Sequence, residues 1–401
     1  MGSDRQPLRF AYVGANAQVH VRAVGQDGPG PSQQVSWTTS LSAMTGWGGG
    51  PGGVEATWPC WAPGQARVAC FVASSAETGT GTQIALSEVD GVHEHRLPVL
   101  DGRMAIHLQW SPDARKVAVL VQHDELLEVW VSDATDPSAQ PRLVAEGSPL
   151  FFAWWGDGRG LVLHVGDGSD GPARLELRDV DGDGDDVVFR IPPGSFCAPL
   201  TVPSPTGERV VYVIPRADGS QLVSADLEGE DVLGLVILPG LVAAVAEPGG
   251  DRIACAGAPD ADGSPYEGVW VVPADGRAPP RQVVTGPLTA FFWRPGHDAI
   301  IYACWDTGRR QLHWRMAAFG EEPVDIAVFR PTRDTYFHLH FFEQFVASHP
   351  LVSPCGRWLV WAGHVEDEDE PDPFVHLADL SVSPPAVQRV ERGSYAVFAP
   401  R

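Results

Sequence analysis

The stretch WSPDARKVAVL, residues 110–120, decides the fold, because its pattern returns six more times along the chain. A strand end, often aromatic, leads into a turn rich in Pro, Asp and Gly, and a strand rich in Val, Ile and Ala follows. The other copies are WAPGQARVACF (61–71), WGDGRGLVLHV (155–165), PSPTGERVVYV (203–213), AEPGGDRIACA (246–256), WRPGHDAIIYA (293–303) and VSPCGRWLVWA (352–362). Their third positions are separated by 49, 45, 48, 43, 47 and 59 residues. A period near 48 with several short strands per unit is typical of β-propeller blades.

The two ends of the chain supply an eighth copy. SYAVFAPR (394–401) matches the strand that enters the turn, and LRFAYVG (8–14) matches the strand that leaves it. Pairing these two strands closes the ring and leaves no free sheet edge. We therefore predict an all-β fold: a single β-propeller domain over residues 1–401, with eight blades of about four strands. Seven blades are the alternative.

Composition and charge exclude several classes. With 44 Gly and 36 Pro in 401 residues, the chain is too rich in helix breakers for a helical bundle. The net charge of -23 argues against nucleic acid and anionic membrane surfaces as partners. No secretory signal and no apolar run of about 18 residues is visible. None of the 6 cysteines forms a Cys-x-x-Cys pair. We expect a cytoplasmic monomer.

The repeated turn resembles that of TolB-type propellers. Eight such units most resemble the N-terminal propeller of the dipeptidyl-peptidase branch of the prolyl oligopeptidase family. The resemblance implies a fold and no catalytic residue, since the nucleophile of that family belongs to a separate hydrolase domain with a Gly-x-Ser-x-Gly elbow. This sequence has no such elbow, so we do not expect a serine peptidase.

Two long connections between blades predict where a site lies. Residues 38–57 precede the first anchor turn, and residues 331–348 account for the 59-residue interval. Both should rim the same mouth of the central channel. The first contains six glycines around Trp47, which we expect to act as the ligand-binding tip of a mobile lid.

The second connection carries most of the candidate chemistry. His338 and His340 are two residues apart, so on an extended segment both imidazoles face one side. Tyr336 and Glu343 are candidate catalytic acids or bases. Arg333 and Gln344 are candidate ligand-binding residues.

Four further histidines fall near this mouth. His349 and His107 each lie five residues before an anchor proline, a position expected on the innermost strands. We count both among the catalytic candidates. His364 and His123 follow at the ends of adjoining strands and are candidate ligand-binding residues. Converging imidazoles could serve as a general base near pH 7 or bind a divalent metal.

The segment from His349 to Pro354 resembles the His-Pro-x-x-Ser-Pro stretch of oligogalacturonate lyase, a TolB-type propeller enzyme. The resemblance implies manganese at His349, with Gln344 upstream at a plausible spacing. Together with the converging imidazoles, it makes His338, His340 and His349 our candidate ligands for a divalent ion such as manganese or zinc. One histidine of that family's pattern is missing, because Ala347 and Ser348 stand before His349. A metal-free polar site and purely structural histidines remain the alternatives.

Three functions stay open. The first is a stand-alone propeller that binds a small molecule or peptide at its channel mouth. The second is a lyase, isomerase or cyclase that uses the histidine cluster, with or without a metal. The third is a scaffold for protein partners, which would not need two long connections over one mouth.

The run DVDGDGDD (179–186) resembles a calcium loop, but position 12 is Arg190 where a Glu is needed, so we interpret it as a hairpin turn.

Overall fold

The computed structural model describes residues 7–25, 28–36, 56–64, 66–76, 79–90, 93–156, 158–168, 173–182, 186–194, 198–205, 207–259, 265–306, 308, 311–365 and 370–400. Within these ranges nearly every element is a strand, which confirms the predicted all-β class. The exceptions among the described residues are two short helices, α1 (Arg333–His340) and α2 (Phe342–Phe345).

Five sheets follow one another along the chain, and in each of them consecutive strands pair antiparallel. The first contains β4 (Ala56–Trp61), β5 (Arg67–Ala76), β6 (Gly79–Glu88) and β7 (Glu94–Arg96), with β8 (Leu100–Asp101) also against β6. The second contains β9 (Met104–Trp110), β10 (Lys116–His123), β11 (Leu126–Asp133) and β12 (Arg142–Gly147). The third contains β13 (Leu150–Trp155), β14 (Gly160–Val165), β15 (Arg174–Asp179) and β16 (Val187–Val188). The fourth contains β17 (Leu200–Ser204), β18 (Gly207–Arg216), β19 (Gly219–Ala225) and β20 (Leu233–Leu238). The fifth contains β21 (Leu241–Ala246), β22 (Arg252–Ala258), β23 (Tyr266–Pro273) and β24 (Arg281–Leu288).

A sixth, ten-stranded sheet joins the two ends of the chain. Its order is β25 (Ala290–Trp293), β26 (Ala299–Asp306), β27 (Gln311–Ala318), β28 (Val324–Pro331), β29 (Trp358–Val365), β30 (Phe374–Asp379), β31 (Ala386–Phe398), β1 (Leu8–Gly14), β2 (Val19–Gly25) and β3 (Gly28–Gln34). The first half of β31 pairs with β30 and its second half pairs with β1, which confirms the predicted pairing of the terminal strands. We interpret this sheet as three blades that remain hydrogen-bonded to one another. With the other five sheets, that interpretation gives eight blades.

The anchor tryptophans tie neighbouring sheets together. The indole N–H of Trp110 donates to the Cys60 carbonyl at 3.1 Å, and that of Trp293 donates to the Val245 carbonyl at 3.1 Å. In the third sheet the preceding residue takes this role, because Trp154 rather than Trp155 donates to Gln109 at 3.2 Å. These bonds explain the tryptophan at the strand end in three of the copies.

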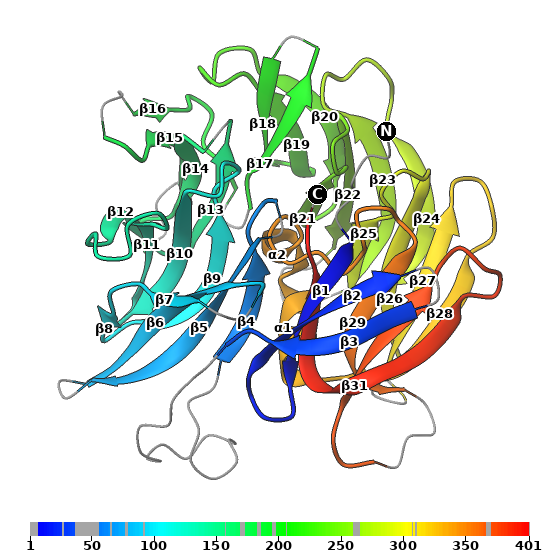
Figure 1. Ribbon diagram of the computed structural model, residues 1–401. Helices are drawn as coiled ribbons and strands as arrows, with labels where there is room; N and C mark the ends of the chain where they lie inside the picture. Colours follow the sequence, from blue (N-terminus) through cyan, green and yellow to red (C-terminus); the bar gives the residue numbers. More distant parts are fainter. Residues whose placement is uncertain are drawn as a thin grey trace, which may run out of the picture.

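The first strand of each sheet lies nearest the axis, since β4 contacts β9, β13 contacts β17, and β17 contacts β21. Figure 1 shows the sheets arranged around a centre in which α1 and α2 lie. The prediction of an extended loop over residues 331–348 is therefore wrong: most of this segment folds into helices that occupy the channel. We call residues 332–349 the plug. Neither helix has the length and apolar character needed to cross a bilayer, and no other helix lies in the described chain.

Candidate functional site

The plug is helical because its start is capped and its apolar residues recur at helical spacing. The Thr332 hydroxyl accepts a hydrogen bond from the Thr335 N–H at 3.1 Å, as at a helix N-terminus. Successive residues on an α-helix are about 100° apart, so His338 and His340 point to nearly opposite sides. The predicted shared side of these imidazoles is wrong: His338 is fully buried and His340 is exposed.

The inner side of the plug is fixed to the closing strand of the ring. His338 Nδ1 and the Tyr395 hydroxyl form a hydrogen bond of 2.7 Å, and Tyr395 belongs to β31. Leu339 and Phe342 are buried beside it, in the core cluster that also contains strands of the closing sheet. The Phe342 ring packs edge-on against Phe291 of β25 at a centroid distance of 4.8 Å.

A serine at the end of the plug joins two of the candidate histidines. The Ser348 hydroxyl lies 2.9 Å from His107 Nε2 and 2.7 Å from His349 Nδ1. The Ser348 carbonyl also accepts the Cys60 thiol at 3.4 Å. The structure thus brings His107, His338 and His349 together, but as a link between the plug and strands β4, β9 and β31.

These three imidazoles are sealed from solvent, with exposed fractions of 2% for His107, 0% for His338 and 1% for His349. Burial lowers the pKa of His107 to about 3 and that of His338 to about 3. Burial, reinforced by the neighbouring His107 and His338, holds the pKa of His349 well below its usual range. All three are neutral at physiological pH, and they contribute uncharged hydrogen-bonding groups to the core.

The donor set does not fit the metal that the lyase resemblance implies. Manganese or zinc needs several donor atoms converging on one point. His340 points away from His338, and Gln344 is partly exposed rather than buried with the histidines. Among the described residues, no group of three or more His, Cys, Asp or Glu side chains could hold a metal ion. The prediction that His338, His340 and His349 share a ligand set is not supported by this geometry.

The outer side of the plug presents the other predicted residues to the channel mouth. Arg333, Tyr336 and His340 are exposed along α1, and Gln344 is partly exposed further on. The Tyr336 and His340 rings stack with an interplanar angle of 18° and a centroid distance of 6.1 Å. The exposed Trp305, at the end of β26, lies edge-on to Tyr336 at 6.1 Å. We call Trp305, Tyr336 and His340 the aromatic row.

Glu343 lies on a third side of the plug, toward β21. It accepts a hydrogen bond from the backbone N–H of Ala244, yet burial dominates and raises the pKa of its carboxyl to about 8. The negative charge it gains on ionisation adds to burial in raising the pKa of Tyr266. Glu343 is therefore largely protonated at neutral pH, and it is partly exposed.

The remaining predicted residues are His364, His123 and Trp47, and the structure does not show them with the buried histidines or with the aromatic row. His364 of β29 pairs with Arg330 of β28. Arg330 lies two residues before the start of the plug. The His123 ring bonds Glu128 of its own sheet at 2.8 Å. Trp47 and residues 37–55 lie outside the described part of the chain.

The residues that the sequence analysis missed include Trp58, Tyr395 and Trp305. The offset that selected His107 and His349, five residues before the third position of the turn, also selects Trp58 and Tyr395. Both are in ring contact with His349, at centroid distances of 6.0 and 6.3 Å. Applied to every copy, that rule would have found them. Trp305 lacks such a signal, because its place beside Tyr336 depends on α1 being helical.

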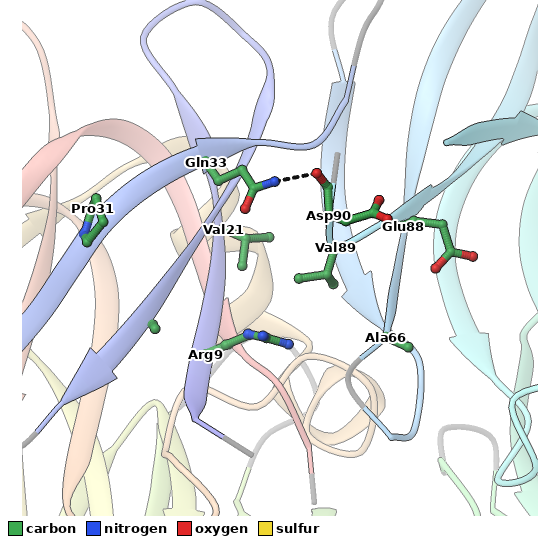
Figure 2. A pocket seen from close by; sticks show the side chains of 9 residues that line it. Arg9, Val21, Pro31, Gln33, Ala66, Glu88, Val89 and Asp90 are labelled. Carbon is green, nitrogen blue, oxygen red and sulfur yellow. Dashed lines mark hydrogen bonds between the residues drawn. The ribbon is translucent and has the colours of Figure 1, made fainter. Parts of the chain in front are cut away.

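Two open clefts of about 520 Å³ lie away from the axis. Figure 2 shows the first, between the closing sheet and the first sheet, where the Gln33 amide donates to the Asp90 carbonyl at 2.6 Å. The wall of this cleft includes Ala66, which lies in the turn between β4 and β5, the first two strands of their sheet. The plug instead follows β28, which is the last of the four consecutive strands β25 to β28. Strands reverse at each turn, so this cleft opens at the other end of the propeller. The second cleft contains Trp305 and lies at the end of the aromatic row.

Comparisons with known proteins agree on the fold. No family model matches the chain, and no curated protein matches it in sequence. A crystal structure of the eukaryotic initiation factor is 12% identical over 99% of this chain and 99% of that one, with a TM-score of 0.55. At this identity the likeness shows the fold alone.

Further matches are weaker in structure. The β-propeller domain of the Trilobed protease from Pyrococcus furiosus is 12% identical over 84% of this chain and 97% of that one, with a TM-score of 0.48. Oligogalacturonate lyase in complex with manganese is 15% identical over 80% of this chain and 84% of that one, with a TM-score of 0.48. TolB from Acinetobacter baumannii and an acylaminoacyl peptidase from Pyrococcus horikoshii are also matched.

Proposed function

We propose that this TolB-like β-propeller binds a small molecule on the outer side of its plug, at the aromatic row. One observation carries the proposal. In the described part of the chain, two large aromatic side chains are exposed, Trp305 at 39% and Tyr336 at 47%, and they contact each other. Exposed aromatic rings in contact offer flat apolar area with polar edges, which suits a ligand that contains a ring.

The way the plug is held supports the same proposal. The bonds of His338 and Ser348 fix the plug to β31 and β9. A rigid support limits the conformational entropy that a ligand must offset when it binds. The buried histidines thus position the row, and the ligand need not touch them.

Catalysis by His107, His338 or His349 would require a substrate to reach these three residues. Each of these side chains is at most 2% exposed, and neither of the two clefts is lined by one of them. This burial argues against chemistry at these three histidines, whereas the exposed candidates His340 and Tyr336 belong to the row on which we propose that the ligand binds.

The test is a thermal-shift screen of small cyclic compounds (aromatic acids, amines, nucleosides and sugars) against the wild type and variants. We expect a compound that raises the Tm of the wild type and acts at least tenfold more weakly on Tyr336→Ala and Trp305→Ala. The control is Leu126→Ala, which also removes an exposed side chain, at 43%, from a different sheet. Equal responses in wild type and both aromatic variants, or no response to any compound class, would refute the proposal.

A further inference from the structure

We propose that the ligand of the aromatic row is a flat, largely apolar compound with two linked aromatic rings, which lies across the outer side of α1 between Trp305 and Trp58. This inference rests on the proposed function and specifies its ligand. The central observation is an unbroken line of ring contacts that crosses the plug from the sixth sheet to the first.

The line continues the aromatic row beyond His340. The His340 ring meets Phe341 edge-on at a centroid distance of 4.6 Å, and Phe341 packs against Phe337 at 4.9 Å. Phe337 in turn meets Trp58 of β4 edge-on at 5.6 Å. We call the aromatic row together with Phe341, Phe337 and Trp58 the aromatic track.

Helical spacing places the rings of the plug on one surface. Residues four apart on a helix lie one above the other, and successive residues are about 100° apart. Tyr336 and His340 therefore form one ridge of α1, and Phe337 and Phe341 form the neighbouring ridge. The buried residues of α1 lie on the opposite side, and they are Thr335, His338 and Leu339. Every ring of the aromatic track is exposed or partly exposed.

A tryptophan from a different sheet stands at each end of the aromatic track. Trp305 belongs to β26 and Trp58 to β4, and Figure 1 shows these strands on either side of α1. Trp58 has a φ of +53°, which bulky residues rarely adopt, and the register of β4 shifts between Thr57 and Cys60. Such bulges re-aim a side chain next to a site, and this one directs the Trp58 ring to the plug.

The middle of the aromatic track is apolar, which decides the class of ligand. The side chains of Phe337 and Phe341 offer no hydrogen-bonding group. A sugar or a peptide placed there would give up water at its hydroxyl or amide groups without a replacement partner, which costs free energy. An aromatic ring loses no such bonds and gains from contact with the other rings. The Tyr336 hydroxyl and the His340 imidazole suit a hydroxyl group at one end of the ligand.

The width of the track favours two rings over one. A single ring on the aromatic row covers one ridge of α1 and leaves Phe337 and Phe341 exposed to water. A second, linked ring covers the neighbouring ridge as well. Since the free energy gained grows with the apolar area removed from water, the two-ring compound should bind more tightly.

The test is calorimetric titration with two compounds that contain two rings, para-phenylphenol and resveratrol, and with the single-ring para-ethylphenol. We expect each two-ring compound to bind the wild type at least tenfold more tightly than para-ethylphenol. Phe341→Leu and Trp58→Leu keep an apolar side chain but remove a ring. Each should weaken the two-ring compounds at least fivefold and leave para-ethylphenol within twofold.

The control variant is Phe319→Leu. Phe319 is also partly exposed, and it follows β27, the third of the strands β25 to β28, so it lies at the other end of the propeller. This substitution should leave the affinities for all three compounds unchanged.

Two outcomes would overturn the inference. These are equal affinities for one-ring and two-ring compounds, or two-ring binding that survives both track substitutions. If Trp58→Leu does not fold, Phe341→Leu decides. If para-ethylphenol depends on Tyr336 and Trp305 but a second ring adds nothing, this inference fails and the proposed function stands. If no compound depends on Tyr336 or Trp305, both fail.

Discussion

At the scale of single residues, one position of the repeat decides which side chain faces the axis. It lies five residues before the third position of each copy. In the closing and first sheets it places Tyr395 and Trp58 in ring contact at 4.5 Å. In the other copies the same position holds Phe152, Leu200, Ala243 and Ala290. The two histidines at this position are therefore His107 and His349, and both bond Ser348.

Substitution of one buried histidine tests this account. His107→Phe should cost about 1 kcal/mol at pH 7, because the ring keeps its contacts with Phe152 and Phe345 and loses only its bond to Ser348. Urea unfolding at pH 7 and pH 5 measures both this cost and its dependence on pH.

The pH dependence has a definite sign. The folded-state pKa of His107 is lowered to about 3, so between about pH 6.5 and 3 the unfolded chain binds a proton that the folded chain does not. The stability that this residue contributes is present above pH 6.5 and is lost as the pH falls. By pH 5 the wild type should lose about 2 kcal/mol that the variant keeps, which makes the variant the more stable protein. An unchanged difference between the two pH values would contradict the neutral buried imidazole.

At the scale of elements, the plug is the part of the chain that departs from the repeat. Thr332 begins it with two bonds, since its hydroxyl accepts from the Thr335 N–H and donates to the Ser394 carbonyl at 2.6 Å. The second bond attaches the start of α1 to β31. The helix is thus positioned by the same strand that bonds His338.

We expect Thr332→Ala to lower the free energy of unfolding by about 1–2 kcal/mol, because it removes a helix cap and the link to Ser394. Thr332→Ser keeps the hydroxyl and should restore most of this stability. Chemical denaturation compares the two variants with the wild type. If the serine variant is as unstable as the alanine variant, the methyl packing of Thr332 matters rather than its bonds.

At the scale of the whole molecule, the ring is closed by a sheet that both ends of the chain build. The second half of β31 pairs with β1, and its residues Tyr395, Val397 and Phe398 are each at most 1% exposed. The cleft of Figure 2 lies at the seam between this sheet and the first one, where Gln33 bonds Asp90. The plug spans the same seam from inside, since it bonds Tyr395 on one side and Cys60 and His107 on the other.

Removal of residues 393–401 tests this closure. Each large apolar side chain lost from the core removes about 1.5–3 kcal/mol, and the sum of three is comparable to the whole stability of many domains. We expect the truncated protein to lose cooperative thermal unfolding as followed by circular dichroism.

A peptide of residues 393–400 added in trans should pair with β1 and recover part of the transition. A scrambled peptide is the control. A truncated protein that melts like the wild type would show that the terminal strand does not hold the ring.

The sequence alone determined the strand repeat, the ring, its closure by the two terminal strands and the inner position of His107 and His349. These follow from local rules: a turn such as the one at Pro112 recurs with a fixed period, and alternation along a strand fixes which side chains face inward. The same rules marked residues 331–348 as a departure from the repeat, because this segment alone lengthens the period to 59 residues.

Only the tertiary structure decided what that segment does. A two-residue spacing of histidines is compatible with an extended loop or a helix, and the strands around the plug stabilised the helix by burying Leu339 and Phe342. The helical conformation places His338 in the core and His340 at the surface. It also places Tyr336 against Trp305, although the two residues are distant in sequence. Such contacts depend on packing between elements, for which a single sequence holds no local signal.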